Sequence, residues 1–393
     1  MSRPASVVVV SPYGAEYGPP RTLEHVARAA ALAGYRPVCA VLPGATLTDG
    51  LRTAAAEVRV VPRLATVPRT LNPSRLALFL RDHLVAAAEI ARIAEEAAAA
   101  LVYTISEATL AGGLAARRLG LPSVTHVIGM SIKSPAWLAR AYVPLLDRLT
   151  TRFVACSSAA ADMLVKHGVA DESIDIVHNS IPIAVVDASA GSPSPLPPGG
   201  GPRVGMVAAY DARKGHELFV ATAAQVVDRH PDARFYIVGG VLRTQAESAV
   251  FEDKVRRLIA ARGLTGRVEQ VGYVAASEVY AWLRALDVVV VPSRTEAFAH
   301  VVLEAMACGR PVVATGIEGN LDAFVHGHSG LYADAEPDAL AEQVSALLED
   351  PAWAAELGAA ARSRASLFFD ESISLPAVAD TIAGLIERAD LAA

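Results

Sequence analysis

The chain alternates short valine- and isoleucine-rich runs with longer alanine- and leucine-rich stretches, and it repeats this pattern in two cycles over 393 residues. The short runs indicate buried parallel strands, and the longer stretches have the spacing of helices. This alternation is typical of α/β layers, in which helices cover a parallel sheet. The expected strands are Val7–Val10, Pro37–Val41, Val58–Val61, Leu101–Thr104, Ser123–Val127, Phe153–Cys156 and Ile174–His178, then Arg203–Ala208, Arg234–Val238, Val268–Val271, Val288–Val291, Pro311–Ala314 and Gly330–Tyr332.

A segment rich in proline, glycine and serine separates the two cycles, and this composition is typical of a linker. We therefore expect an N-terminal domain over 1–185, a linker over 186–202 and a C-terminal domain over 203–370. The helix expected over 371–393 is a candidate to pack back on the first domain. Two doubly wound, Rossmann-like domains imply a cleft, because open α/β sheets bind ligands outside the carboxyl ends of their strands.

Composition excludes several classes of protein. The formal net charge is −6, whereas a domain that binds nucleic acid through its overall charge is usually strongly basic. The most apolar long stretch, Val85–Val102, is interrupted by four charged residues, so we expect no transmembrane segment. The three cysteines are far apart and lack metal-ligand spacing. With no signal-type segment at the N-terminus, these features favour a cytoplasmic protein.

The segment Val288–Thr315 is the most informative part of the sequence. A buried strand ends before Pro292, a short loop carries Glu296, and a helix that starts near Ala299 carries Glu304. The start of a helix offers N–H groups and the positive end of the helix dipole, which suit a diphosphate. Carboxylates accept hydrogen bonds from sugar hydroxyls. The segment therefore predicts a site for a nucleotide sugar, although each glutamate taken singly also suits a solvated surface charge.

Glu296 and Glu304, with the Ala305–Ala314 segment that follows them, resemble the hallmark of retaining GT-B glycosyltransferases of family 4 (glycosyl transferases group 1). Further motifs of this family occur in the same order along nearly the whole chain. They are the glycine-rich loop at Gly14–Thr22, the strand-end histidine in Ser123–Val127, the Val177–Ser180 element, the Arg/Lys loop at Ala208–Gly215 and the strand Leu286–Ser293. The resemblance implies a GT-B fold, with two Rossmann-like domains that face each other across a cleft.

The resemblance also implies roles for residues of the second domain. Glu304 would bind the ribose, and Glu296 would bind hydroxyls of the donor hexose together with the backbone N–H groups of Phe298 and Ala299. Lys214 would neutralise the diphosphate. The remaining donor-binding positions are the backbone amides of His300 and Val301, the base-binding loop at Val274, and Arg213, which we expect to replace the family's arginine at the position of Ala209.

In the first domain, the resemblance places His126 near the donor sugar, so that the catalytic set is Glu296, His126 and Lys214. Gly18 would allow the backbone close to the phosphate. Glu16, Tyr17 and His126 are the candidates for acceptor binding. Because a lysine can neutralise the diphosphate and no Asp-x-Asp pair is present, we expect neither a metal nor a cofactor.

The expected reaction transfers a hexose from a nucleotide-diphosphate sugar, UDP-sugars being favoured, to a hydroxyl of a small soluble acceptor such as an aminocyclitol or natural-product intermediate. The resemblance implies that the anomeric configuration is retained. One alternative is a lipid-linked or glycan acceptor at a membrane surface, with peripheral membrane contact. Another is a nucleotide-sugar epimerase of GT-B shape. The membrane alternative draws on seven arginines in one stretch: Arg52, Arg59, Arg63, Arg69, Arg75, Arg81 and Arg92.

Overall fold

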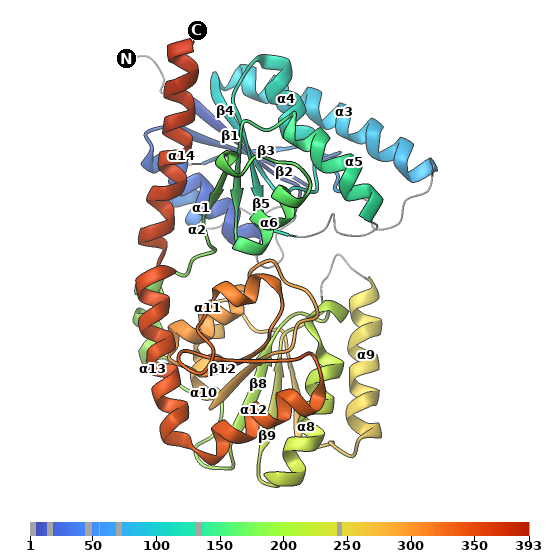
Figure 1. The fold of residues 1–393 in the computed structure, drawn as a ribbon, viewed down its shortest axis with the longest axis vertical. Helices are drawn as coiled ribbons and strands as arrows, with labels where there is room; N and C mark the ends of the chain where they lie inside the picture. Colours follow the sequence, from blue (N-terminus) through green and yellow to red (C-terminus); the bar gives the residue numbers. More distant parts are fainter. Residues whose placement is uncertain are drawn as a thin grey trace. The chain divides into compact units, whose positions relative to one another are not determined.

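The computed structural model describes residues 5–13, 19–43, 49–54, 56–67, 73–129, 136–241 and 246–392. The chain divides into two compact units (Figure 1). The first unit comprises Met1–Asn179 and Ser372–Ala393, and the second comprises Ser180–Glu371. Every strand expected from the sequence coincides with a strand of the structure, within one or two residues at each end.

The described part of the first unit contains a parallel sheet of seven strands in the order β3-β2-β1-β4-β5-β6-β7. The strands are β1 Ser6–Ser11, β2 Arg36–Val41, β3 Glu57–Val60, β4 Ala99–Ile105, β5 Ser123–Val127, β6 Arg152–Ala155 and β7 Ile174–Ile176. The helices are α1 Pro19–Leu32, α2 Asp49–Thr53, α3 Pro73–Glu96, α4 Ala111–Leu119, α5 Ala136–Asp147, α6 Ser158–Lys166 and α14 Glu371–Ala392, with the short η1 at Asp171–Ser173.

Strand β1 explains why the first sheet is covered on both faces. Its residues are all buried, and successive side chains point to opposite faces. Val7 and Val9 pack in the apolar cluster that includes α1 and α14. Val8 and Val10 pack in another cluster, with α3 and α4. The continuous valine run is therefore the pattern of a central strand between two helical layers.

The described part of the second unit contains a parallel sheet of six strands in the order β10-β9-β8-β11-β12-β13. The strands are β8 Arg203–Val207, β9 Arg234–Val238, β10 Val268–Gly272, β11 Val288–Val291, β12 Val312–Thr315 and β13 Leu331–Ala333. The helices are α7 Ile183–Ala188, α8 His216–Arg229, α9 Ala246–Ala261, α10 Val279–Ala285, α11 His300–Ala307, α12 Pro337–Glu349 and α13 Pro351–Phe368. Short helices are η2 Ser189–Gly191, η3 Ala212–Lys214 and η4 Glu318–Asp322.

Both sheets reverse their strand order at one point, between β1 and β4 in the first unit and between β8 and β11 in the second. At such a switch point the connections leave toward opposite faces of the sheet, and a crevice opens outside the carboxyl ends of the two strands. The loops that follow β8 and β11 carry Lys214 and Glu296. The topology alone therefore brings these two sequence-predicted residues to the same edge of the second sheet.

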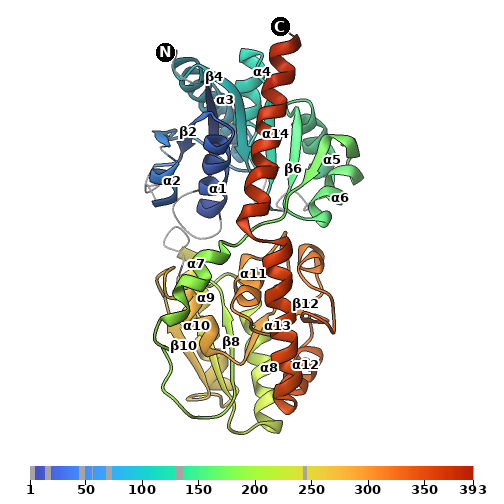
Figure 2. The same cartoon turned by 90° about the vertical axis from the view of Figure 1, so that its left-hand side faces the viewer.

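The last helix and the segment expected to be a linker have definite places in these units. Val378, Ile382 and Leu385 of α14 are buried in the apolar cluster of the first unit, beside the α1 layer (Figure 2). The segment expected to be a linker over 186–202 belongs to the second unit. Val186 in it is fully buried, and Arg284 donates to the Ser189 carbonyl at 3.1 Å. The division falls after Asn179, earlier than the expected residue 185.

Candidate functional site

Two loops at the carboxyl edge of the second sheet form the core of the candidate site. The first runs from the end of β8 through η3 to α8, and the second runs from the end of β11 to α11. Gly215 joins η3 to α8 with a φ of 75°, a left-handed conformation that glycine adopts without strain. A Cβ at this position would lie 1.8 Å from the carbonyl oxygen of Pro292. The two loops are therefore packed backbone against backbone.

Backbone hydrogen bonding reinforces this contact, since the Arg294 amide donates to the Arg213 carbonyl at 2.7 Å. The turn itself is stabilised by Asp211, whose side chain accepts from the Arg213 amide at 2.9 Å. An aspartate at this cap position satisfies an N–H group that the short helix leaves open. The loop that presents Lys214 is thus fixed at both ends.

Lys214 and Glu296 meet across these loops, 82 residues apart in the sequence. The Lys214 Nζ forms an ion pair with the Glu296 Oε1. The same oxygen accepts a hydrogen bond from the Ser293 Oγ at 2.9 Å. The Ser293 carbonyl in turn accepts from the Thr315 Oγ1 at 2.6 Å. The carboxylate side chain is only 13% exposed, so its position is set by this chain of contacts.

The loop before α11 is also closely packed. Ala297, Phe298 and Ala299 are buried, and the Phe298 ring lies 5.5 Å from that of Phe369. A Cβ on Gly319 would lie 1.4 Å from the Ala297 carbonyl oxygen, so only glycine allows η4 to approach this loop. Ala299, at the N-cap position of α11, provides no side-chain hydrogen bond, and the first residues of the helix are His300 and Val301. The N-terminal end of a helix carries a positive potential that suits an anion.

Glu304 lies within α11, eight residues after Glu296, and is 5% exposed. A glutamate is rarely so deeply buried unless it has hydrogen-bond or ionic partners. The position is on the same short helix whose N-terminus borders the loop of Glu296. The structure therefore brings Lys214, Glu296 and Glu304 to neighbouring elements of one sheet edge.

The loop proposed to meet the nucleotide base follows β10 and carries Val274. It is held close to the ends of β8 and β9, because the Gly239 amide donates to the Gly272 carbonyl at 2.9 Å. A Cβ on Gly239 would lie 2.0 Å from the Ala208 carbonyl oxygen. Tyr273 is 72% exposed beside Val274. This edge thus offers an exposed aromatic ring that the sequence reasoning did not single out.

Arg213 points its guanidinium at a carboxylate. Its Nε lies 3.1 Å from both carboxylate oxygens of Asp211, and its side chain is 55% exposed. In the described structure this charge is thus engaged by a neighbour at the surface. Its expected role as a substitute for an arginine at Ala209 stays a prediction.

In the first unit, His126 lies at the carboxyl end of β5 and is 4% exposed. Its Nδ1 lies 3.1 Å from the Tyr103 hydroxyl, and its Nε2 has no hydrogen-bond partner among the described residues. Burial lowers the pKa of His126 to about 3. The imidazole is therefore neutral at physiological pH and contributes no positive charge.

Polar groups surround His126 where β1, β4 and β5 end. Ser106 adopts a φ of 89°, unusual for a residue with a side chain, and its amide donates to the His126 carbonyl at 2.8 Å. The Ser106 Oγ lies 2.8 Å from the hydroxyl of Tyr13. Glu107 is fully buried, and its charge contributes to raising the pKa of the buried Tyr142, for which burial is the larger cause. Of the acceptor candidates, Glu16 and Tyr17 lie outside the described residues, as does Gly18.

Several of these residues escaped the sequence reasoning. Ser293 lies two residues after the end of β11 and Thr315 is the last residue of β12, so their position after valine runs is the available signal. Glu107 and Tyr142 carried no motif. What distinguishes them is burial, which depends on the packing of the whole unit.

Buried histidines predict how stability depends on pH. Burial lowers the pKa of His216 to about 4 and also lowers that of His83. An unfolded histidine has a pKa of about 6.5, so below that pH the unfolded chain takes up protons that the folded chain does not. We expect the melting temperature to fall from pH 7 to pH 5, with a shallower fall for His126→Gln. If the melting temperature of this variant fell as steeply with pH as that of the wild type, the lowered pKa of His126 would be contradicted.

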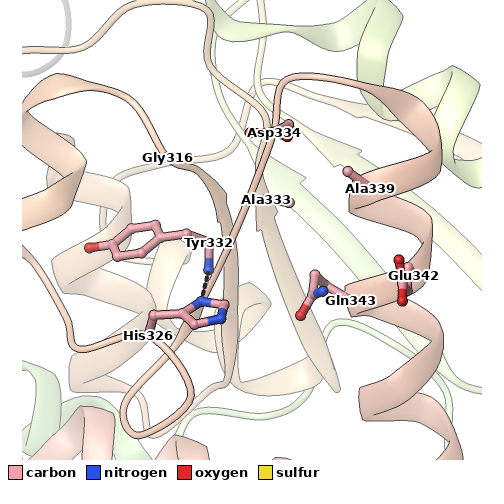
Figure 3. A pocket seen from close by; sticks show the side chains of 8 residues that line it. All are labelled: Gly316, His326, Tyr332, Ala333, Asp334, Ala339, Glu342 and Gln343. Atoms are coloured by element: carbon pink, nitrogen blue, oxygen red, sulfur yellow. Dashed lines mark hydrogen bonds between the residues drawn. The ribbon is translucent and has the colours of Figure 1, made fainter.

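A cavity of about 320 Å³ lies elsewhere in the second unit, where β12 and β13 end against α12 (Figure 3). Its lining includes Tyr332, Asp334 and Glu342. His326 also lines it, and its Nδ1 accepts from the Tyr332 amide at 2.9 Å. None of the sequence-predicted site residues lines this cavity.

The described residues offer neither a cluster of metal ligands nor a membrane-spanning helix. No group of three or more histidine, cysteine, aspartate or glutamate side chains is placed to hold a metal ion. No described helix is both long and apolar enough to span a membrane.

Comparison with known proteins bears on the family. The family described as Glycosyltransferase Family 4 matches residues 18–185, and Glycosyl transferases group 1 matches residues 191–364. The D-inositol 3-phosphate glycosyltransferase of Pseudarthrobacter chlorophenolicus is 36% identical over 221 residues, which are 54% of this chain and 51% of that protein. The protein of the same name from Paenarthrobacter aurescens is 31% identical over 245 residues, 60% of this chain and 59% of that one. The chain thus spans about half the length of the curated relatives that it matches.

Solved structures agree on the fold. HepE of Anabaena, crystallised in complex with UDP, has a TM-score of 0.75 at 21% sequence identity. The match covers 96% of this chain and 100% of the HepE chain. Sucrose-phosphate synthase of Thermosynechococcus elongatus has a TM-score of 0.77 at 20% identity, with 99% and 100% covered. The predicted fold class and the family resemblance are both confirmed. The chain belongs to the GT-B glycosyltransferases of the family 4 type.

Proposed function

We propose that the protein transfers a hexose from a nucleotide-diphosphate sugar, with UDP-sugars favoured, to a hydroxyl group of a small acceptor. The observation that carries this proposal is the meeting of Lys214 and Glu296 at the β8–β11 switch point, beside the N-terminus of α11. A cation and a helix N-terminus suit a diphosphate, and a carboxylate suits sugar hydroxyls. HepE, which shares the fold, was crystallised with UDP and with UDP-glucose, which supports the choice of base.

We further propose that transfer retains the anomeric configuration. The bond between the anomeric carbon and the diphosphate breaks, and the acceptor oxygen bonds to the same face of the sugar. The acceptor's proton passes to the departing phosphate oxygen. Lys214 and the N–H groups at the start of α11 stabilise the charge that develops on the leaving group, a task for which no metal or cofactor is needed.

The acceptor belongs, in this proposal, at the carboxyl ends of β1, β4 and β5. Tyr13, Ser106 and His126 meet there, and Glu107 is buried beside them. Hydroxyl, carboxylate and neutral imidazole groups suit an acceptor with several hydroxyl or amino groups. Relatives named as D-inositol 3-phosphate glycosyltransferases support a small polyol as the acceptor class, with an aminocyclitol as a related choice.

A panel of donors tests the proposal most directly. The protein is titrated calorimetrically with UDP-, GDP- and dTDP-sugars, and each donor that binds is offered to inositols, aminocyclitols and a lipid-linked sugar. We expect a UDP-sugar to bind and a small polyol or aminocyclitol to accept the sugar. Failure of every nucleotide sugar to bind would exclude the proposed function. Conversion of a UDP-sugar into its epimer, without any acceptor, would point to an epimerase.

Glu304→Gln tests the proposed ribose contact. A carboxylate that accepts hydrogen bonds from two hydroxyls is worth about 1.5–3 kcal/mol, so we expect donor affinity to fall about tenfold or more. UDP and UDP-glucose should weaken equally, because both carry the ribose, and kcat should change little. Glu356→Gln, at an exposed position of α13, is the matched control. Selective weakening of UDP-glucose would contradict a ribose role.

A further inference from the structure

Lys214 and Glu296 form an ion pair with each other, although the proposed function has them bind different parts of the donor. Lys214 is assigned to the diphosphate and Glu296 to the hexose, yet in this structure they bind each other. Glu296 Oε1 accepts from both Lys214 Nζ and Ser293 Oγ. Any diphosphate that binds Lys214 must therefore compete with a carboxylate that already holds it.

The cost of this competition depends on what else the ligand carries. The Glu296 side chain is 13% exposed, so water reaches it poorly when Lys214 turns to a phosphate. The Ser293 bond remains and keeps the carboxylate close to the incoming negative charge. A nucleoside diphosphate alone offers Glu296 no hydrogen-bond donor in return. An intact donor supplies hexose hydroxyls, which take the place of the lysine.

We propose that Glu296 makes the site discriminate between the intact sugar donor and the nucleoside diphosphate left after transfer. This inference rests on the proposed function. It assigns to the ion pair a specificity role in addition to hexose recognition: the pair opposes the binding of the spent nucleotide and so favours its release. Product release limits the turnover of many enzymes, so such discrimination affects the rate as well as the affinity.

Replacing the carboxylate with its uncharged isostere tests this inference. In Glu296→Gln, Lys214 no longer has an anionic partner, so a diphosphate binds it without competition. We expect the affinity for UDP to rise about two- to fivefold, the range expected for loss of a partly exposed ion pair. Affinity for UDP-glucose should stay the same or fall. Isothermal titration of the wild type and the variant with UDP and with UDP-glucose measures both, with GDP and GDP-mannose run in parallel.

Glu217→Gln is the matched control, because Glu217 is also paired with a lysine, Lys254, at 2.7 Å. It removes one negative charge only three residues from Lys214 while leaving Glu296 in place. We expect it to change the affinities for UDP and UDP-glucose by the same factor, below about twofold. If it tightened UDP as much as Glu296→Gln does, general electrostatics would explain the effect and the inference would be overturned.

The remaining outcomes separate this inference from the proposed function. Unchanged or weaker UDP binding by Glu296→Gln, with normal binding by the wild type, overturns the inference alone. Failure of the wild type to bind either diphosphate and either donor overturns the proposed function and the inference with it. Thermal melting checks that each variant is folded, and Glu296→Ala is the second variant if the glutamine form is not. Glu296→Ala should likewise bind UDP more tightly than the wild type does, with unchanged or weaker binding of UDP-glucose.

Discussion

Lys214→Met is expected to reduce turnover about 10²–10³-fold, because it removes a preorganised positive charge from the leaving diphosphate. Methionine has a similar length and leaves the Gly215 turn free to form. The loss should appear mainly in kcat if the lysine acts most strongly on the charge that develops as the glycosidic bond breaks. Steady-state kinetics with the donor and acceptor found in the panel measures kcat and KM separately.

Lys254→Met is the control for this experiment. Lys254 is one of the four lysines of the chain and lies in the same unit, and its side chain is 59% exposed and paired with Glu217. Its loss should leave kcat within about twofold, since exposed ion pairs contribute little. A Lys214→Met variant with more than a third of the wild-type turnover would exclude the charge-neutralising role. A rise in KM alone would mean that Lys214 helps to bind the donor but does not contribute to the chemical step.

The strands are predictable from the sequence because a strand that is buried on both faces consists of a continuous run of apolar, β-branched residues. Val7–Val10 and Val288–Val291 are continuous β-branched runs, and each is a central strand next to a switch point. The positions of Lys214 and Glu296 at strand ends followed from those runs. The sequence therefore predicts which elements carry the candidate site.

The contact between Lys214 and Glu296 could not be predicted, because it depends on the close approach of two loops 82 residues apart. The family resemblance implies separate partners on the donor for the two residues. The neutral state of His126 was equally hidden, since it follows from burial behind strand ends. The composition of the segment 186–202 predicts a linker. Composition does not reveal that Val186 is fully buried.

Gly215→Ala is expected to destabilise the second unit by about 2–5 kcal/mol and to abolish donor binding. Two effects add: a φ of 75° costs an L-residue about 1–2 kcal/mol, and overpacking costs about 1–3 kcal/mol more. The new Cβ would lie 1.8 Å from the Pro292 carbonyl oxygen, and neither backbone can yield as a flexible side chain would. The loops of Lys214 and Glu296 must therefore separate.

Gly263→Ala distinguishes the cost of backbone strain from that of the steric clash with Pro292. Gly263 has a φ of 68°, close to that of Gly215, but a Cβ there would meet nothing within 4 Å. It should therefore cost only the backbone term, about 1–2 kcal/mol, and leave nucleotide binding intact. Thermal unfolding and titration with UDP compare the two variants. Equal losses of stability would mean that the contact with Pro292 contributes nothing. Normal UDP binding by Gly215→Ala would mean that the donor site does not depend on holding these two loops together.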